Sequence, residues 1–267
     1  MPDLLGEIFR QRHRLLEREM EQEPLAHLQT RAEQSRLCRR SLRARLAAAA
    51  PPALICEIKR ASPSAGVIDA TIDPGAWARG YQRAGADAVS VLTEPDHFLG
   101  RLQDLDQARA GCDLPLLRKD FLDHPYQVVQ SAAHGADAIL AIVAGLDDRS
   151  LAGLLAEARA WGLEALVEVH SQPELERALD QEVDLLGINN RDLRTLQVDL
   201  GVTERLLPLV PKTVTVVSES GFRQREQLRR CQRAGVGAFL VGEALLRSGE
   251  PLSLLGQLKG SDARVMP

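Results

Sequence analysis

Aromatic residues are scarce in this sequence, where Phe, Trp and Tyr together make up only 3% of 267 residues. A chain with so few rings offers no platform on which the bases of a single-stranded nucleic acid could stack. The formal net charge of -4 supplies no general attraction for nucleic acid or for an anionic membrane. We therefore expect no nucleic-acid or membrane partner, and any anionic ligand must be held by local groups.

Cysteine is also sparse, and long apolar runs are missing. The four cysteines are scattered without a C-x-x-C pair, so nothing indicates a disulfide framework or a zinc site. No basic segment followed by an apolar stretch opens the chain, and no apolar run approaches the ~20 residues of a membrane-spanning helix. The sequence therefore predicts a soluble cytoplasmic protein without a bound metal ion.

The first part of the chain has a helical pattern. Apolar residues at helical spacing predict one helix from residue 3 to 23, which ends at Pro24. An Arg- and Gln-rich stretch predicts a second helix from Leu25 to Ala50, because the pair Pro51-Pro52 forbids its continuation. The expected domains are an N-terminal helical extension over 1–50, a main domain over 51–260 and a C-terminal tail over 261–267.

Eight short apolar runs follow, separated by segments with helical patterns. A strand followed by a crossover helix leads to parallel pairing, so the alternation predicts a parallel sheet. Eight such units favour a closed (β/α)₈ TIM barrel. An open doubly wound sheet is the alternative, but it should carry a glycine-rich dinucleotide turn after its first strand, and none is present. The predicted strands are Ala53–Lys59, Ala88–Leu92, Pro115–Lys119, Ala138–Val143, Ala165–Val169, Leu185–Asn189, Val214–Glu219 and Ala238–Gly242.

The third run passes from apolar into charged residues. Side chains alternate between the two faces of a strand, so Leu117, Lys119 and Phe121 share one face. Arg118 and Asp120 share the other. On a single strand these charges would indicate no more than an ion pair at the strand end. Several other runs finish in the same way, which indicates that the charges converge on one place.

In a (β/α)₈ barrel the carboxyl ends of the strands form the functional face. The polar residues that end five of the runs share parity with an apolar residue of the same strand, so each can point into the barrel. An internal ion-pair network is the structural alternative. Burying so many charges is costly unless they are paired, which favours a catalytic centre. Its candidate members are Glu57, Lys59, Lys119, Glu168, Asn189, Arg191 and Glu219.

A second group of residues suits a phosphate. Ser220 and Gly221 follow the seventh run, and Gly242 follows the eighth and opens a helix. Backbone N–H groups beside glycine suit an anion, and phosphate-binding barrels place it after strands 7 and 8. The hydroxyls of Ser62 and Ser64 could reach the same oxygens. Gly242 alone would indicate an ordinary turn, but together these residues predict a phosphate site.

Two further residues give weaker signals. His170 follows Glu168 on the same strand face and could bind a metal ion, but no second His or Cys has supporting spacing. A polar residue satisfied by its neighbours is the preferred interpretation of His170. Ser220 is not predicted to be a nucleophile, because Ser-Glu-Ser-Gly differs from the G-x-S-x-G turn.

Five segments of the chain form a specific set, namely Cys56–Ser64, Ser90–Pro95, Leu117–Phe121, Gly187–Leu193 and Ser218–Gly221, followed by Gly242–Leu245. In this order and over nearly the whole chain, they resemble the indole-3-glycerol phosphate synthase family. The resemblance implies a (β/α)₈ barrel with an N-terminal helical extension, in agreement with the independent prediction above.

The resemblance also implies a reaction. It is the ring closure of 1-(2-carboxyphenylamino)-1-deoxyribulose 5-phosphate to indole-3-glycerol phosphate in tryptophan biosynthesis, with loss of CO₂ and water and without a cofactor. Attack on the ketone needs a general acid, and Lys119 matches the family's acid. Glu168 matches the general base for the dehydration, and Glu57 is a second candidate whose role stays open.

Binding roles follow from the same resemblance. Lys59 and Arg191 would hold the carboxylate that leaves as CO₂, while Asn189 and Glu219 would fix the hydroxyls and the lysines. The phosphate would lie against Ser62, Ser220, Gly221 and Gly242. The aromatic ring would occupy an apolar pocket lined by Leu92, Phe98, Phe121 and Leu140.

The sequence departs from the family pattern at a few positions. Glu243 follows Gly242 where some members have serine, and a carboxylate there would repel a phosphate unless it points away or caps the helix. We therefore leave Glu243 out of the predicted site. Ala65 replaces a lysine, and Leu99 and Arg101 replace more polar residues. These changes concern affinity and loop mobility, and leave the proposed acid and base untouched.

Two alternative functions remain at this point. A phosphoribosylanthranilate isomerase of the same architecture would not explain a lysine and an arginine for a second anion, and a silent phosphate-binding barrel should lack Lys119 or Glu168. The length leaves no room for a fused isomerase domain, so we expect a monofunctional enzyme. We also expect a monomer that associates at most weakly with other tryptophan-pathway enzymes.

Overall fold

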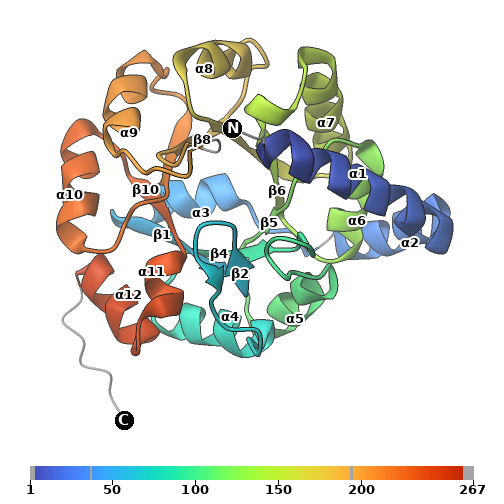
Figure 1. The fold of residues 1–267 in the computed structure, drawn as a ribbon, viewed down its shortest axis with the longest axis horizontal. Helices are drawn as coiled ribbons and strands as arrows, with labels where there is room; N and C mark the ends of the chain where they lie inside the picture. Colours follow the sequence, from blue (N-terminus) through green and yellow to red (C-terminus); the bar gives the residue numbers. More distant parts are fainter. Residues whose placement is uncertain (1–3, 37, 193–194, 261–267) are drawn as a thin grey trace.

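Eight parallel strands close into a barrel, as Figure 1 shows. The computed structural model describes residues 4–36, 38–192 and 195–260, so the predicted tail and residue 3 lie outside the described residues. The closed barrel confirms the TIM fold and excludes the open sheet. Each predicted strand matches an observed one within a residue at each end. The barrel strands are β1 Ala53–Ile58, β4 Ala88–Leu92, β5 Leu116–Lys119, β6 Ala138–Ile142, β7 Glu164–Val169, β8 Leu185–Asn189, β9 Thr215–Glu219 and β10 Ala238–Val241.

The barrel closes between its first and last strands. β1 pairs with β10, with Ala53 opposite Ala238, and on its other edge β1 pairs with β4, with Ile55 opposite Ala88. A short antiparallel hairpin that the sequence did not predict follows β1 and consists of β2 Ala61–Ser62 and β3 Gly66–Val67. Because β1 pairs with β10, the first and last strands of the barrel lie side by side.

Helices surround the barrel (Figure 1), and several start at side chains that cap them. Asp73 accepts a hydrogen bond from the Ala76 N–H, and Asp147 accepts one from the Ser150 N–H, which satisfies backbone donors in the first turn. These helices are α4 Pro74–Arg83, α5 Gln103–Gly111, α6 Pro125–Ala133, α7 Asp148–Ala160, α8 Gln172–Leu179, α9 Gly201–Leu206, α10 Arg225–Ala234, α11 Glu243–Arg247 and α12 Pro251–Lys259, with 3₁₀ turns η1 Val143–Gly145 and η2 Leu207–Leu209.

The barrel interior combines an apolar layer with a polar one. Ile55, Leu166 and Val217 are fully buried in the core. The next residues on the same strand faces, two positions further along, are Glu57, Glu168 and Glu219, because side chains alternate between the two faces of a strand. The apolar layer thus supports a ring of charged groups at the carboxyl ends of the strands.

The N-terminal region differs from the prediction in one respect. The first helix, α1 Leu4–Gln22, agrees with it, but the predicted helix over 25–50 is two helices, α2 Leu25–Arg36 and α3 Leu42–Ala48. Ser41 caps α3 by accepting from the Ala44 N–H, while the Arg40 N–H donates to Asp137 of the barrel at 2.8 Å. Capping and this tertiary contact together outweigh the helical propensity of the sequence between the two helices.

The helix α1 lies across the barrel mouth on the side of β5 and β6 (Figure 1). Its Phe9 ring meets the edge of Phe121 at 5.6 Å between ring centroids. Arg12, which is buried, contacts Asp120 at 3.3 Å in the loop after β5. The N-terminal region is therefore attached to the residues that directly follow Lys119.

Candidate active site

One pocket of about 380 Å³ opens at the carboxyl ends of the barrel strands. This volume falls in the range of small-molecule sites. Every residue of the predicted site lines it, from Glu57 and Lys59 at the end of β1 to Gly242 after β10. The residues that the sequence predicted for the site therefore converge on one pocket.

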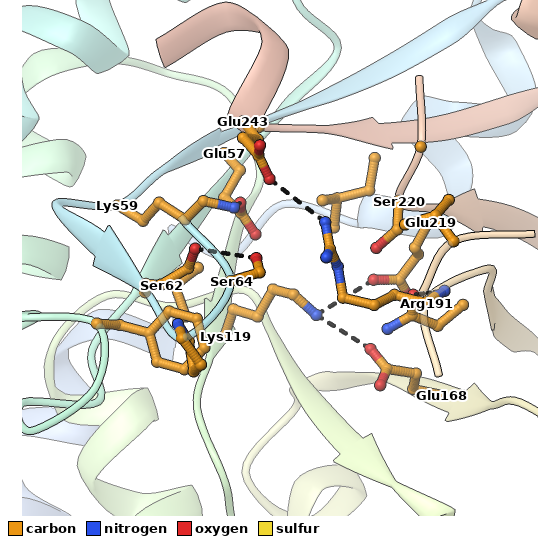
Figure 2. Close-up of a pocket in the computed structure, with 18 of the residues that line it drawn as sticks. Glu57, Lys59, Ser62, Ser64, Lys119, Glu168, Arg191, Glu219, Ser220 and Glu243 are labelled. Atoms are coloured by element: carbon orange, nitrogen blue, oxygen red, sulfur yellow. Dashed lines mark hydrogen bonds and ion pairs between the residues drawn. The ribbon is translucent and has the colours of Figure 1, made fainter. Parts of the chain in front are cut away.

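The centre of the pocket holds an ammonium between two carboxylates (Figure 2). Lys119 Nζ donates to Glu168 Oε2 at 3.0 Å and to Glu219 Oε2 at 3.2 Å. The three side chains come from β5, β7 and β9 and are nearly inaccessible to solvent. Lys119 and Glu168, both predicted members of one catalytic centre, are therefore in direct contact.

Burial and mutual attraction oppose each other in this cluster. Burial acts to lower the pKa of Lys119, but Glu168, Glu219 and Glu57 outweigh it, so the pKa is raised and the ammonium stays charged. Burial acts to raise the pKa of Glu168, but Lys119 and His170 outweigh it, so the pKa is lowered. For Glu219, burial and the Glu168 charge prevail over Lys119 and raise the pKa to about 7. The two carboxylates thus differ in proton affinity although they share one cation.

A second ion pair lies at the end of β1. Lys59 donates to Glu57 in a short contact, and both side chains are almost buried. On the opposite wall, the Asn189 side chain is held by accepting from the Arg191 N–H at 3.0 Å. Lys59 therefore brings a positive charge to the pocket, and the carboxylate of Glu57 already neutralises part of that charge.

The loop after β9 is fixed in an unusual backbone conformation. Ser220 has a φ of 66° and Gly221 a φ of 91°, in the left-handed region. Asn190 holds the loop from behind, because its Nδ2 donates to the Glu219 and Ser220 carbonyls at 3.0 and 3.2 Å. A Cβ at Gly221 would lie 2.5 Å from Val198 Cγ1. Both the backbone conformation and the neighbouring side chain thus require glycine here.

Glu243 occupies a position that the sequence did not predict. The sequence predicts that Glu243 lies outside the site, either pointing away or capping a helix, but Glu243 lines the pocket. Its carboxylate accepts from Arg191 Nη2 at 3.3 Å (Figure 2), and it lies 3.6 Å from both Arg223 and Arg247. Arg247 lies four residues further along the same helix, α11, whereas Arg191 and Arg223 come from other segments, so no local pattern signals those two contacts.

The apolar part of the pocket contains the four predicted residues and more. Leu92, Phe98, Phe121 and Leu140 all line it. Three further members come from α1, whose amphipathic pattern was the available signal in the sequence: Leu4, Leu5 and Ile8. The N-terminal helix is therefore part of the pocket wall.

Behind Lys119 lies a buried polar cluster. Asp120 accepts from Arg118 Nη2 at 2.7 Å and from the Thr93 hydroxyl at 2.7 Å, and Arg12 reaches it from α1. The Arg118 and Asp120 side chains are fully inaccessible to solvent. As predicted from strand parity, Arg118 and Asp120 point away from Lys119, and they anchor the strand end that carries it.

His170 is held by carboxylates. Its Nδ1 lies 3.1 Å from Glu174 Oε2, and its Nε2 lies 3.3 Å from Glu168 Oε1 without the alignment of a hydrogen bond.

The part of the chain that the structure describes contains no group of three or more His, Cys, Asp or Glu side chains suited to a metal ion, and none of its helices could span a membrane.

The sequence matches one protein family over most of its length. The family model described as Indole-3-glycerol phosphate synthase matches residues 5–257. A protein of that name from Parafrankia sp. is 50% identical over 205 residues, which cover 77% of this chain and 76% of the relative. The one from Polaromonas naphthalenivorans is 44% identical over 263 residues, which cover 97% of this chain and 100% of the relative.

Solved structures of lower identity share the fold. A thiamine phosphate pyrophosphorylase from Pyrococcus furiosus has a TM-score of 0.58 at 17% identity, covering 82% of this chain and 96% of that one. An N-acetylmannosamine-6-phosphate 2-epimerase from Clostridium perfringens has a TM-score of 0.56 at 16% identity, covering 73% and 88%. At this identity the likeness concerns the barrel architecture alone.

Proposed function

The chain belongs to the indole-3-glycerol phosphate synthase family, and from this premise we propose that its pocket converts 1-(2-carboxyphenylamino)-1-deoxyribulose 5-phosphate to indole-3-glycerol phosphate. The observation that carries the proposal is the Lys119 ammonium between the carboxylates of Glu168 and Glu219. Ring closure needs a proton donor at the ketone, and the later loss of water needs a proton acceptor. The cluster supplies both kinds of group within one pocket.

Lys119 is the proposed general acid. Its three carboxylate neighbours keep it protonated in the resting enzyme, so a proton is always in place for the substrate's carbonyl oxygen. A substrate oxygen that enters the pocket and accepts from Nζ would compete with these carboxylates. The ring carbon can then attack the ketone carbon, and loss of CO₂ restores the aromatic ring.

Glu168 is the proposed general base for dehydration, because its lowered pKa keeps it ionised. Glu57 remains a second acid–base candidate, since it lines the same pocket and forms a pair with Lys59. Glu219 accepts from Lys119 and has a free buried oxygen, Oε1, which suits it to bind a substrate hydroxyl. Asn189 lines the wall beside it and suits the same purpose.

The substrate's two anions have separate partners in this proposal. Lys59 is assigned to the carboxylate that leaves as CO₂. The phosphate is assigned to the loop of Ser220 and Gly221 together with Ser62 and Gly242, which line the same pocket. The family resemblance assigns Arg191, with Lys59, to the carboxylate. We instead place Arg191 on the phosphate side, because its backbone pairs with Val198, which packs against Gly221. The apolar residues from β4 to β6 and from α1 leave room for the aromatic ring.

The direct test supplies the carboxyphenylamino-deoxyribulose phosphate and follows indole fluorescence. The wild-type protein should give a time-dependent rise in fluorescence that saturates with substrate. Phosphoribosylanthranilate, the substrate of the isomerase alternative, should give no indole product and no isomerisation. Absence of the indole signal from folded wild-type protein would reject the proposed function.

We further propose that the protein acts in the cytoplasm as a monomer and associates at most weakly with other tryptophan-pathway enzymes. The residues predicted for the site all line one pocket within the chain, so the proposed chemistry requires no group from a second copy. Sedimentation at several protein concentrations tests this, and a concentration-independent dimer would contradict it.

Replacing Gly221 with Ala should weaken substrate binding. The added Cβ meets Val198 at 2.5 Å and the φ of 91° is unfavourable for alanine, so the loop must shift and its N–H groups lose their alignment with the phosphate. Loss of one hydrogen bond to a charged group corresponds to a KM increase of about tenfold. The measurement is steady-state kinetics with indole fluorescence.

Gly237→Ala is the matched control, because a Cβ there meets nothing within 4 Å. It should leave KM unchanged. Equal effects of both substitutions, or a fall in kcat with KM unaltered in Gly221→Ala, would contradict a phosphate anchor at this loop.

Replacing Glu243 with Gln should instead strengthen binding. The carboxylate occupies three arginines and repels a phosphate, so its removal leaves Arg191 available for the substrate. For partly exposed charges we expect KM to fall about threefold at low salt, and the effect should shrink as salt is added. The exposed Glu250→Gln serves as control. A raised KM would mean that Glu243 is needed to hold Arg191 in place.

A further inference from the structure

His170 lies directly beyond β7 and outside the pocket wall, yet it contacts a pocket residue. Its Nε2 is 3.3 Å from Oε1 of Glu168, whose other oxygen, Oε2, accepts from Lys119. The side chain of His170 is only 13% exposed. The two oxygens of Glu168 therefore face two different cation-forming groups, one inside the pocket and one behind it.

Glu174, on the first turn of α8, holds the far side of the imidazole. Its Oε2 lies 3.1 Å from His170 Nδ1 and accepts from the His170 N–H at 2.8 Å. Its Oε1 accepts from the Ser171 hydroxyl at 2.8 Å. A carboxylate thus holds the ring at Nδ1, while Nε2 lies within ion-pair distance of a second carboxylate, an arrangement that suits an imidazolium better than a neutral imidazole.

The charges around this group come from several elements. His170 faces Glu168 on its own strand and Glu174 on α8. Glu168 in turn faces Lys119 on β5, which also pairs with Glu219 on β9. Burial acts to lower the pKa of His170, but the two carboxylates outweigh it and raise the pKa to about 10. The imidazolium is therefore present throughout the neutral range.

We propose that the His170 imidazolium, held by Glu174, is a positioning residue that keeps Glu168 ionised and turns its Oε2 toward the reacting groups. This inference rests on the proposed function of Glu168 as general base. His170 itself does not line the pocket, so it acts on the reaction only through the carboxylate.

The proposed role becomes important during the acid step. When Lys119 donates its proton to the carbonyl oxygen, it becomes a neutral amine and Glu168 loses its cation at Oε2. A buried carboxylate without a positive neighbour would bind a proton. The imidazolium at Oε1 remains, so Glu168 stays ionised and available for the dehydration that follows.

The test compares the pH dependence of kcat in the wild type, His170→Asn and His170→Gln. Without the cation the pKa of Glu168 rises, so the base form is lost at a higher pH and the acid limb moves upward by about 1 pH unit. Both variants should shift alike, because the asparagine and glutamine amides can donate a hydrogen bond but carry no charge. If His170 only filled space, both substitutions would lower kcat equally at every pH and leave the acid limb of the profile at its wild-type pH. That result would overturn the proposal.

A second measurement is independent of activity. Ring NMR signals of the six histidines can be followed against pH, with His170 assigned by its absence in His170→Asn. In the wild type the His170 ring should stay protonated to about pH 10, and Glu174→Gln should lower its titration midpoint. A His170 ring that is neutral at pH 7 in the wild type would overturn the proposal.

The activity assay and the NMR titration distinguish a failure of the proposed function from a failure of the proposed role of His170. A wild type that forms no indole product refutes the proposed function, whereas the NMR titration reports on His170 in either case. His27→Asn, at an exposed position on α2, is the matched control and should leave both the kcat profile and the His170 titration unchanged.

Discussion

Lys119→Met is expected to reduce kcat about 10³-fold, the contribution typical of a positioned general acid. Methionine has a similar length, so the pocket keeps its shape, but no proton can be delivered to the carbonyl oxygen. The substitution also leaves Glu168 and Glu219 without their shared cation, so both carboxylates should bind protons more tightly. The loss therefore concerns the acid directly and the base indirectly.

A second substitution separates these two effects. Lys119→Arg keeps the positive charge between the carboxylates, but a guanidinium does not give up its proton in proteins. It should remain inactive while Glu168 stays ionised. Lys212→Met, at an exposed lysine, is the matched control and should retain wild-type kcat. The assay is indole fluorescence, with circular dichroism to verify folding, and an active Lys119→Met would remove Lys119 from the mechanism.

Asp120→Asn is expected to lower the free energy of unfolding by about 3–5 kcal/mol, the cost of breaking a buried ion pair from one side. The Asp120 carboxylate lies between the buried guanidiniums of Arg12 and Arg118 and accepts from the Thr93 hydroxyl and the Phe121 N–H. An amide cannot neutralise two buried cations. The substitution should also loosen α1, since Arg12 would lose its partner in the barrel.

Urea unfolding of Asp120→Asn and Asp113→Asn tests this expectation. Asp113 pairs with Arg40 but its side chain is 87% exposed, so its loss should change the free energy of unfolding by less than about 1 kcal/mol. Equal destabilisation by both changes would contradict the assignment of a buried ion cluster.

The pH dependence of stability has a defined sign for Asp120. Burial acts to raise its pKa, but Arg12 and Arg118 outweigh it and lower the pKa to about 2. A group whose folded pKa is depressed stabilises the folded state above its unfolded pKa of 3.8. This contribution is lost as the pH falls from about 4 toward 2, and Asp120→Asn should lack that acid-dependent component.

The barrel and its polar ring could be predicted because both depend on local patterns. Strand parity alone places Glu57, Glu168 and Glu219 beside apolar neighbours that point the same way, and the closed topology then brings them together. The same rule assigns Arg118 and Lys119 to opposite faces of β5.

What could not be predicted depends on contacts between distant segments. The break between α2 and α3 comes from Ser41 and from Asp137 of the barrel, neither of which a helical period reveals. Glu243 lies in the pocket and contacts Arg191 and Arg223, which lie on other segments of the chain. The pairing of Arg12 with Asp120 depends on where α1 docks, which the amphipathic pattern of α1 leaves open.

The pairing of β1 with β10 has a consequence for the protein during its synthesis. A nascent chain still lacking its last barrel strand has unpaired edges on β1 and β9, where other chains could bind. It also lacks Gly242, whose missing Cβ leaves space for the Glu57 carboxylate. Ribosome-bound intermediates should therefore be inactive and prone to association, and activity should emerge only when translation has passed the final strand.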